Sequence, residues 1–315
     1  DVVTMLRIVF NTKNRLTLAV SGTGSAGMES ALSNVLEPDD KIIIGQNGYF
    51  SERMVEMAIR LGAQPIPVTT EWGLPIDPGS IEEALNKNNG TKAIAIVHAE
   101  TSTGVLQNIK DISYLAKKHN ALLIVDAVTT LGGSPVSVDE WGIDICYSAT
   151  QKCLGCPPGL SPITVSDMAE SIIKSRKIKP TSWYLDLALV ENYWMEHSYH
   201  HTAPILMIYA LREGLRVILE EGLDNRFRRH EQNANALRNG LAALNLKLVV
   251  PEDYRTNQIT TVSIPEKVDD AKVRSILLKK YGIEIAVGLG RFRGKAWRIG
   301  LMGESCKSEN VISLI

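Results

Sequence analysis

Cysteine is scarce in this sequence, with four residues among 315. Small secreted domains that depend on disulfides carry far more cysteine for their length. A disulfide scaffold is therefore excluded, and a reducing compartment is expected. We expect the cytoplasm, with the peroxisome or the mitochondrion as the alternatives in a eukaryotic cell.

Long apolar runs and an excess of charge of either sign are also missing. No run reaches the ~20 residues of a membrane-spanning helix, and no signal peptide is expected. The 34 basic and 35 acidic residues are spread along the chain and nearly cancel. A nucleic-acid footprint and a polybasic membrane patch are thus excluded. What remains is the ordinary composition of a globular protein, 44% apolar and 22% charged.

Neither end of the chain has the pattern of a natural terminus. Residues 1–10 read as the middle of a helix without a starting Met or a cap, and residues 309–315 stop within a helical pattern. We expect both ends to be incomplete.

Short apolar, β-branched runs alternate with helix-length segments over the first 200 residues. Strands that are apolar throughout and separated by crossover helices are typical of a mostly parallel sheet with helices on both faces. This predicts an α/β fold for the large domain. The expected strands are residues 16–20, 41–45, 63–70, 92–98, 121–126, 143–148 and 160–166.

The pattern changes after residue 200. A long helical stretch, interrupted near Gly222, is followed by a strand at 257–265, a helix at 269–282 and a strand at 296–302. We expect a large domain over residues 1–220 and a smaller C-terminal α+β domain over 221–315.

A glycine-rich turn follows the first strand. Gly22, Gly24 and Gly27 match the dinucleotide fingerprint G-x-G-x-x-G between a strand and a helix. The acidic residue that should end the second strand is absent, which disfavours NAD. Free N–H groups at a helix N-terminus still suit one phosphate. The alternative is a tight turn with a Ser or Thr cap.

Polar residues end several further strands of the expected sheet. Asp126 ends one strand, Thr101 follows another, and Tyr49 and Phe50 follow a third; Lys152 comes after the strand at 143–148. Ligands of open α/β sheets bind at this edge. A phosphate, a flat ring, a cationic ring nitrogen and an aldehyde would satisfy all these groups, and pyridoxal phosphate (PLP) combines them. The alternatives are helix capping for Asp126 and core packing for the aromatics.

Cys153 and Cys156 flank Lys152 in a Cys-x-x-Cys pair. A zinc site needs a second ligand pair, and a redox pair needs a position at the start of a helix. Cys146 and Cys306 do not supply the second pair, and no metal is expected. We interpret both thiols as small packing groups.

Several blocks of the sequence together resemble a known family. In chain order, they resemble the class V (fold type I) aminotransferases, within them the alanine–glyoxylate / serine–pyruvate group. The blocks are SGTGSAGMESALSNVLEPDD, HAETSTGVLQ, LLIVDAVTTLGGSPV, YSATQKCLGCPPGLS, SYHHTAP and GKAWRIGLMG.

The resemblance implies a role for each matching residue of the cofactor site. Lys152 would form the Schiff base with PLP, and Asp126 would keep the pyridine nitrogen protonated. Phe50 would stack on the ring, and Thr101 would hydrogen-bond near its phenolic oxygen. The residues that would hold the phosphate are Thr23, Gly24, Ser25 and Gln151, with Ser25 standing where some members carry a His.

The resemblance also implies a shared active site and a substrate anchor. Tyr199 and Thr202 would reach the phosphate bound to the neighbouring subunit, which makes a homodimer obligatory. Arg298 would pair with the substrate carboxylate, as its planar fork matches a carboxylate in a bidentate manner. From the residues alone, the alternative is that Arg298 lies on an edge strand with its side chain pointing to solvent.

The expected function is PLP-dependent, ping-pong transamination between a small amino acid, alanine or serine, and a 2-oxo acid, glyoxylate or pyruvate. Lys152 would also be the general base. The alternatives on the same fold are a 2-aminoethylphosphonate or kynurenine-type aminotransferase and a cysteine desulfurase, for which Cys306 is the candidate thiol. A non-catalytic subunit that kept the fold is a further alternative.

Overall fold

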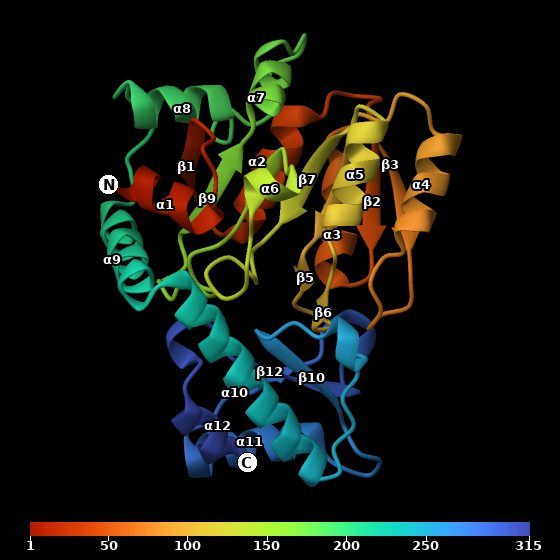
Figure 1. Ribbon diagram of the computed structural model, residues 1–315, viewed down its shortest axis with the longest axis vertical. Helices are drawn as coiled ribbons and strands as arrows, with labels where there is room; N and C mark the ends of the chain where they lie inside the picture. Colours follow the sequence, from red (N-terminus) through yellow and green to blue (C-terminus); the bar gives the residue numbers. More distant parts are fainter.

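The computed structural model describes residues 1–315, and a seven-stranded sheet forms its larger part (Figure 1). All seven strands expected in this region are present, and the prediction of an α/β fold is confirmed. They are β1 (Leu16–Ser21), β2 (Lys41–Gln46), β3 (Gln64–Thr69), β4 (Ala93–Val97), β7 (Leu122–Asp126), β8 (Ile145–Tyr147) and β9 (Leu160–Val165). Their order across the sheet is β1-β9-β8-β7-β4-β2-β3.

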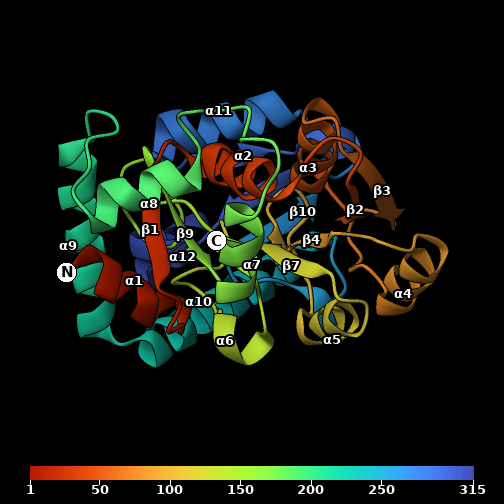
Figure 2. The same ribbon diagram turned by 90° about the horizontal axis from the view of Figure 1, so that it is seen from above.

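Helices cover both faces of this sheet, and Figure 2 shows them as two layers. One layer contains α1 (Val2–Phe10), α4 (Pro78–Lys87), α5 (Lys110–Lys118), the short α6 (Val138–Trp141) and α9 (Ile205–Glu221). The other contains α2 (Gly24–Val35), α3 (Tyr49–Arg60), α7 (Asp167–Lys174) and α8 (Leu187–Met195).

The apolar strands divide their side chains between these two layers. Within β2, Ile43 belongs to one core cluster, and Ile42 and Ile44 belong to the other. All three are fully buried, because successive side chains of a strand point to opposite faces and both faces are covered. Burial on both faces is the reason that the strands are apolar without alternation.

Strand direction determines where the site lies. β9 pairs antiparallel with both β1 and β8, so β1 runs parallel to β8 and to the remaining strands. The carboxyl ends of β1, β2, β4, β7 and β8 therefore meet at one edge of the sheet. This edge faces the C-terminal part of the chain (Figure 1).

The C-terminal part is built on a three-stranded antiparallel sheet in the order β10-β12-β11. The expected helices and strands are present, and the two-residue β11 was not anticipated. Its elements are α10 (Leu223–Ala243), β10 (Ile259–Ser263), α11 (Asp270–Tyr281), β11 (Ala286–Val287), β12 (Ala296–Gly300) and α12 (Ser308–Leu314), with short 3-10 turns at Glu252–Tyr254, Gly290–Phe292 and Gly303–Ser305.

The long helical stretch is broken at Gly222. This residue has φ +80°, a backbone conformation that favours glycine, and it separates α9 from α10. The division into domains at residues 220 and 221 stays a prediction. A small ribbon of β5 (Ala99–Glu100) and β6 (Val105–Leu106) lies between the two sheets (Figure 1).

None of the helices combines the length and the apolar character needed to cross a membrane.

Candidate active site

A cavity opens at the edge where the parallel strands end. Its empty volume is about 610 Å³, open solvent at the mouth included. The structure brings together most of the residues expected at the cofactor site. Those that line the cavity are Thr23, Gly24, Ser25, Phe50, Thr101, Asp126, Gln151 and Lys152.

The glycine-rich turn forms one wall of the cavity. α2 begins at Gly24, and the Thr23 side chain does not cap it. The N–H groups of Gly24 and Ser25 have no acceptor within the chain. A Cβ at Gly24 would lie 3.0 Å from Val128 Cγ2, so glycine permits this close approach. Unpaired N–H groups at a helix N-terminus make this wall an anion site.

Asp126 ends β7 at the floor of the cavity. Its Oδ1 accepts the Val128 N–H at 2.8 Å, and its Oδ2 accepts the Tyr147 hydroxyl at 2.9 Å. Burial raises the pKa of Asp126 to about 6, and these two hydrogen bonds oppose the rise. No helix begins after Asp126, so the alternative of a helix cap is wrong, and its bond to Val128 closes a turn. The carboxyl group lines the same cavity as Lys152, and a cationic partner would stabilise its charged form.

Lys152 lies in the turn between β8 and β9. Burial lowers the pKa of its ammonium group, and the positive charge of Arg298 lowers it further, while Asp126 opposes the shift. A lowered pKa increases the fraction of neutral amine at physiological pH. The neutral amine is the form that acts as a nucleophile or a general base.

Phe50 and Thr101 are held by a buried carboxyl group between them. Glu100 accepts the N–H of Phe50 at 3.2 Å and the N–H of Ser51 at 3.1 Å, which satisfies the N-terminus of α3. The Thr101 hydroxyl is hydrogen-bonded to that of Thr129. Glu100 also accepts the N–H of Ser102, next to Thr101, at 3.1 Å, so it orients two walls of the cavity although it does not line it.

Arg298 belongs to β12 and lies next to the cavity without lining it. Its Nη1 donates to the Thr101 carbonyl at 3.1 Å, and its Nε donates to the Val287 carbonyl at 3.0 Å. The side chain is half-buried and bridges the two parts of the chain, which differs from the alternative of an edge-strand arginine in solvent.

Tyr199 and Thr202 are not brought into this cavity. Tyr199 is 78% exposed, and its hydroxyl lies 3.5 Å from the Thr202 hydroxyl. His201 of the same segment approaches the glycine-rich turn, with its Nε2 2.6 Å from the Ser21 hydroxyl.

Two polar residues of the site were missed in the sequence. Arg53 lines the cavity, and its Nη1 donates to the Ser25 hydroxyl at 2.8 Å. Its spacing from Phe50, three positions along one helix, could have indicated it. Tyr147 faces Asp126 across the parallel β7–β8 pair. No local signal specifies that register.

The cysteines beside Lys152 pack into the core. Cys153 donates to the Thr129 carbonyl and Cys156 to the Ala210 carbonyl, both at 3.3 Å. Burial raises the pKa of Cys153 to about 12 and that of Cys156 to about 11, which makes both thiols unreactive. Cys306 is also buried and does not line the cavity. No group of three His, Cys, Asp or Glu side chains is placed to hold a metal ion.

Comparison with known proteins agrees with this geometry. The family model for aminotransferase class V matches residues 4–291. The chain is 42% identical to the (S)-ureidoglycine–glyoxylate transaminase of Bacillus subtilis, covering 99% of the chain and 79% of the relative. It is also 42% identical to the alanine–glyoxylate aminotransferase of Callithrix jacchus, covering 97% of the chain and 75% of the relative.

A solved structure extends the likeness to the fold. The alanine–glyoxylate aminotransferase of Nostoc sp. superposes with a TM-score of 0.97 at 45% identity, covering 100% of this chain and 83% of the other. The architecture is that of the fold type I aminotransferases. The chain belongs to the class V aminotransferase family, whose members depend on PLP.

Proposed function

We propose that this chain binds PLP and catalyses ping-pong transamination between a small amino acid, alanine or serine, and a 2-oxo acid, glyoxylate or pyruvate. One observation carries the proposal: the amine of Lys152, the carboxyl group of Asp126 and the anion-binding turn at Gly24 line a single cavity.

The residues present fit the phosphate of PLP. The N–H groups of Gly24 and Ser25 lack partners within the chain, and an anion would satisfy them. Thr23 and Gln151 line the same wall and can add further hydrogen bonds. Arg53 places a positive charge beside Ser25, which favours a doubly charged anion.

The residues also fit the ring. Phe50 offers an aromatic face, and Asp126 offers a carboxylate for a protonated ring nitrogen. A cation there would lower the pKa of Asp126 again, so binding would remove the penalty that burial imposes. Thr101, which lines the same cavity, would donate to the phenolic oxygen.

PLP, when bound, supplies an aldehyde that condenses with amines and a ring that accepts electrons from the substrate α-carbon. Lys152 would hold the aldehyde of the bound cofactor. When its amine is free, it would act as the general base that takes the α-proton of the amino acid and as the acid that returns a proton. The lowered pKa of Lys152 favours the neutral amine that this step requires. Asp126 keeps the ring nitrogen protonated throughout.

Arg298 is the proposed anchor of the substrate carboxylate. Its Nε and Nη1 hold backbone carbonyls, which leaves Nη2 without a partner in the chain. A carboxylate that bound Nη2 and competed for Nη1 would be aligned by a rigid fork.

The choice of substrates follows from the relatives. The two curated relatives named above both carry glyoxylate in their names, which supports glyoxylate as the acceptor. Purified protein with added PLP is tested against alanine, serine and ureidoglycine as donors, each with glyoxylate and with pyruvate. We expect alanine or serine with glyoxylate to give the highest kcat/KM; ureidoglycine as the only productive donor would overturn this choice.

The subunit arrangement is proposed to be a homodimer. Exposed aromatic and aliphatic side chains gather near the segment that carries Tyr199 and Thr202, and a neighbouring subunit would cover them. They are Trp183, Tyr184, Tyr199, Ile205, Leu206 and Tyr209. Within this dimer, Tyr199 and Thr202 would complete the phosphate site of the partner.

The proposed compartment is the cytoplasm. All four cysteines are free and buried, which supports a reducing environment. Fractionation of the source cells tests this assignment, and a signal in an oxidising compartment would contradict it.

A further inference from the structure

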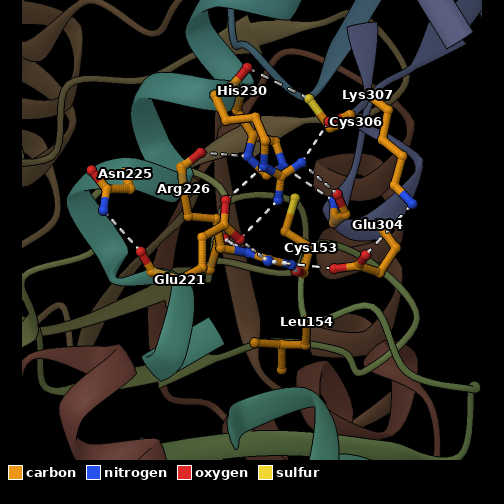
Figure 3. A network of polar contacts seen from close by, with 12 residues as sticks. Cys153, Leu154, Glu221, Asn225, Arg226, His230, Glu304, Cys306 and Lys307 are labelled. Atoms are coloured by element: carbon orange, nitrogen blue, oxygen red, sulfur yellow. Dashed lines mark hydrogen bonds and ion pairs between the residues drawn. The ribbon is translucent and has the colours of Figure 1, made fainter. Parts of the chain in front are cut away.

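A buried guanidinium lies behind the lysine turn and outside the cavity. Arg226 of α10 is 1% exposed. Its Nε donates to the Gly132 carbonyl at 2.9 Å, its Nη2 to the Cys153 carbonyl at 2.8 Å, and its Nη1 to the Glu221 carboxylate at 2.6 Å (Figure 3). Burying this charge is costly without such partners, so the three acceptors hold the guanidinium in one orientation.

Two of these acceptors belong to the backbone that carries the reacting groups. Cys153 directly follows Lys152, and Gly132 lies six residues after Asp126 in the loop that follows β7. The Cys153 thiol also connects these two segments, because it donates a hydrogen bond to the Thr129 carbonyl. The planar fork of Arg226 therefore links the segment that carries the amine to the segment that carries the carboxylate.

The neighbours of Arg226 on α10 bind the loop that packs on the lysine turn. His230 Nε2 accepts the Gly303 N–H at 3.1 Å, and Arg229 donates to the Gly303 and Cys306 carbonyls. Gly303 has φ +57°, and a Cβ there would lie 3.1 Å from the Cys153 carbonyl oxygen. The lysine turn is thus clamped between Arg226 and the 303–306 loop.

We infer that Arg226 is a positioning residue for Lys152. It holds the lysine turn through the Cys153 carbonyl, and through the Gly132 carbonyl it keeps Lys152 aligned with Asp126. This inference rests on the proposed function of Lys152. Without the fork, two buried carbonyls lose their donors, and the turn relaxes to satisfy them. A displacement of the amine by about 1 Å can cost about 100-fold in rate.

Arg226→Lys tests the inference, because the lysine keeps the charge but cannot span two carbonyls and a carboxylate. Arg228→Lys is the matched control, since Arg228 lies exposed on the same helix and its hydrogen bond goes to Asn225, away from the lysine turn and the 303–306 loop. In the cofactor-free protein, competitive labelling with acetic anhydride against pH reports the pKa of the Lys152 amine. Steady-state kinetics and the melting temperature are measured in parallel.

For Arg226→Lys we expect the labelling pKa to move toward that of an ordinary lysine and kcat to fall about 10- to 100-fold with little change in KM. For Arg228→Lys we expect labelling and kcat near those of the unmodified protein. An Arg226→Lys protein that melts earlier but keeps both the labelling profile and kcat would show a structural role only, and the inference would be wrong.

A second variant covers the case in which Arg226→Lys does not fold. Glu221→Gln weakens the hold on the same guanidinium and leaves the arginine in place. We expect the labelling pKa to shift in the same direction, by less than in Arg226→Lys and by more than in Arg228→Lys. The absence of this shift would count against the inference. Labelling needs no cofactor, so its result is independent of whether the unmodified protein binds PLP, which tests the proposed function separately.

Discussion

Single residues of the site gain their chemistry from burial. Asp126 and Lys152 have opposite charges, yet burial disfavours the charged form of each, raising one pKa and lowering the other. An acid with a raised pKa and an amine with a lowered pKa in one cavity are typical of a catalytic site.

Asp126→Asn should change how the stability of the cofactor-free protein depends on pH. The pKa of Asp126 is about 6 in the folded chain and 3.8 in its ordinary state, so the folded state binds the proton more tightly. Stability contributed by this group is full below about pH 4 and is lost as pH rises to about 6, by up to about 3 kcal/mol. The asparagine variant should lack this decline.

Urea unfolding of both proteins between pH 4 and 7 checks this prediction. The difference between the two curves removes the other titrating groups, which both proteins share. Parallel curves would show that Asp126 has no raised pKa.

With PLP added, the same variant should bind the cofactor more weakly and lose activity by orders of magnitude.

At the scale of elements, the parallel strands and the helix that follows β1 create the anion site. α2 begins without a side-chain cap, and its first N–H groups open into the cavity. The position of Gly24 against Val128 and Ala149 leaves no room for a Cβ without a shift of a few tenths of an ångström.

Gly24→Ala should therefore weaken PLP binding about tenfold, since overpacking of this kind costs about 1–3 kcal/mol. Gly300→Ala is the matched control, because a Cβ there would meet its nearest atoms at 3.8 Å and beyond. Fluorescence titration of the cofactor-free proteins measures both affinities. Equal weakening in the two variants, or none in Gly24→Ala, would contradict the account of this turn.

The elements also show which features can be predicted from sequence. Apolar runs located the strands of the large sheet, because all of them except the edge strand β3 are largely buried on both faces, which leaves a strong local signature. The antiparallel direction of β9 left no such signature, as a fully buried strand has the same composition in either direction. Arg226 was missed for a related reason: in the polar stretch RFRRHEQN, a buried arginine cannot be told from its exposed neighbours.

At the scale of the whole molecule, the account proposes two incomplete sites that become complete in a dimer. The cavity residues come from one chain, and Tyr199 and Thr202 lie outside it on the surface. Only the family resemblance indicates their roles. The sequence of one chain contains no pattern that identifies which group of a neighbouring subunit a residue contacts.

Complementation between inactive variants tests this arrangement. Lys152→Ala and a Tyr199→Phe/Thr202→Val double variant should each have low activity. Dimers that contain one subunit of each keep one intact site, so an equal co-expressed mixture should reach about a quarter of the unmodified activity. Activity no higher than the mean of the two variants would show that the sites are not shared, and a monomer in sedimentation would contradict the dimer itself.

The central claim is that Lys152 carries the cofactor, and chemical fixation tests it most directly. Borohydride reduction of the PLP-loaded protein converts a lysine–aldehyde linkage into a stable secondary amine, which peptide mass spectrometry then locates. The account predicts a pyridoxyl-phosphate label on Lys152, absent from Lys152→Ala. A label on a different lysine, or no fixed label in a protein that binds PLP, would contradict it.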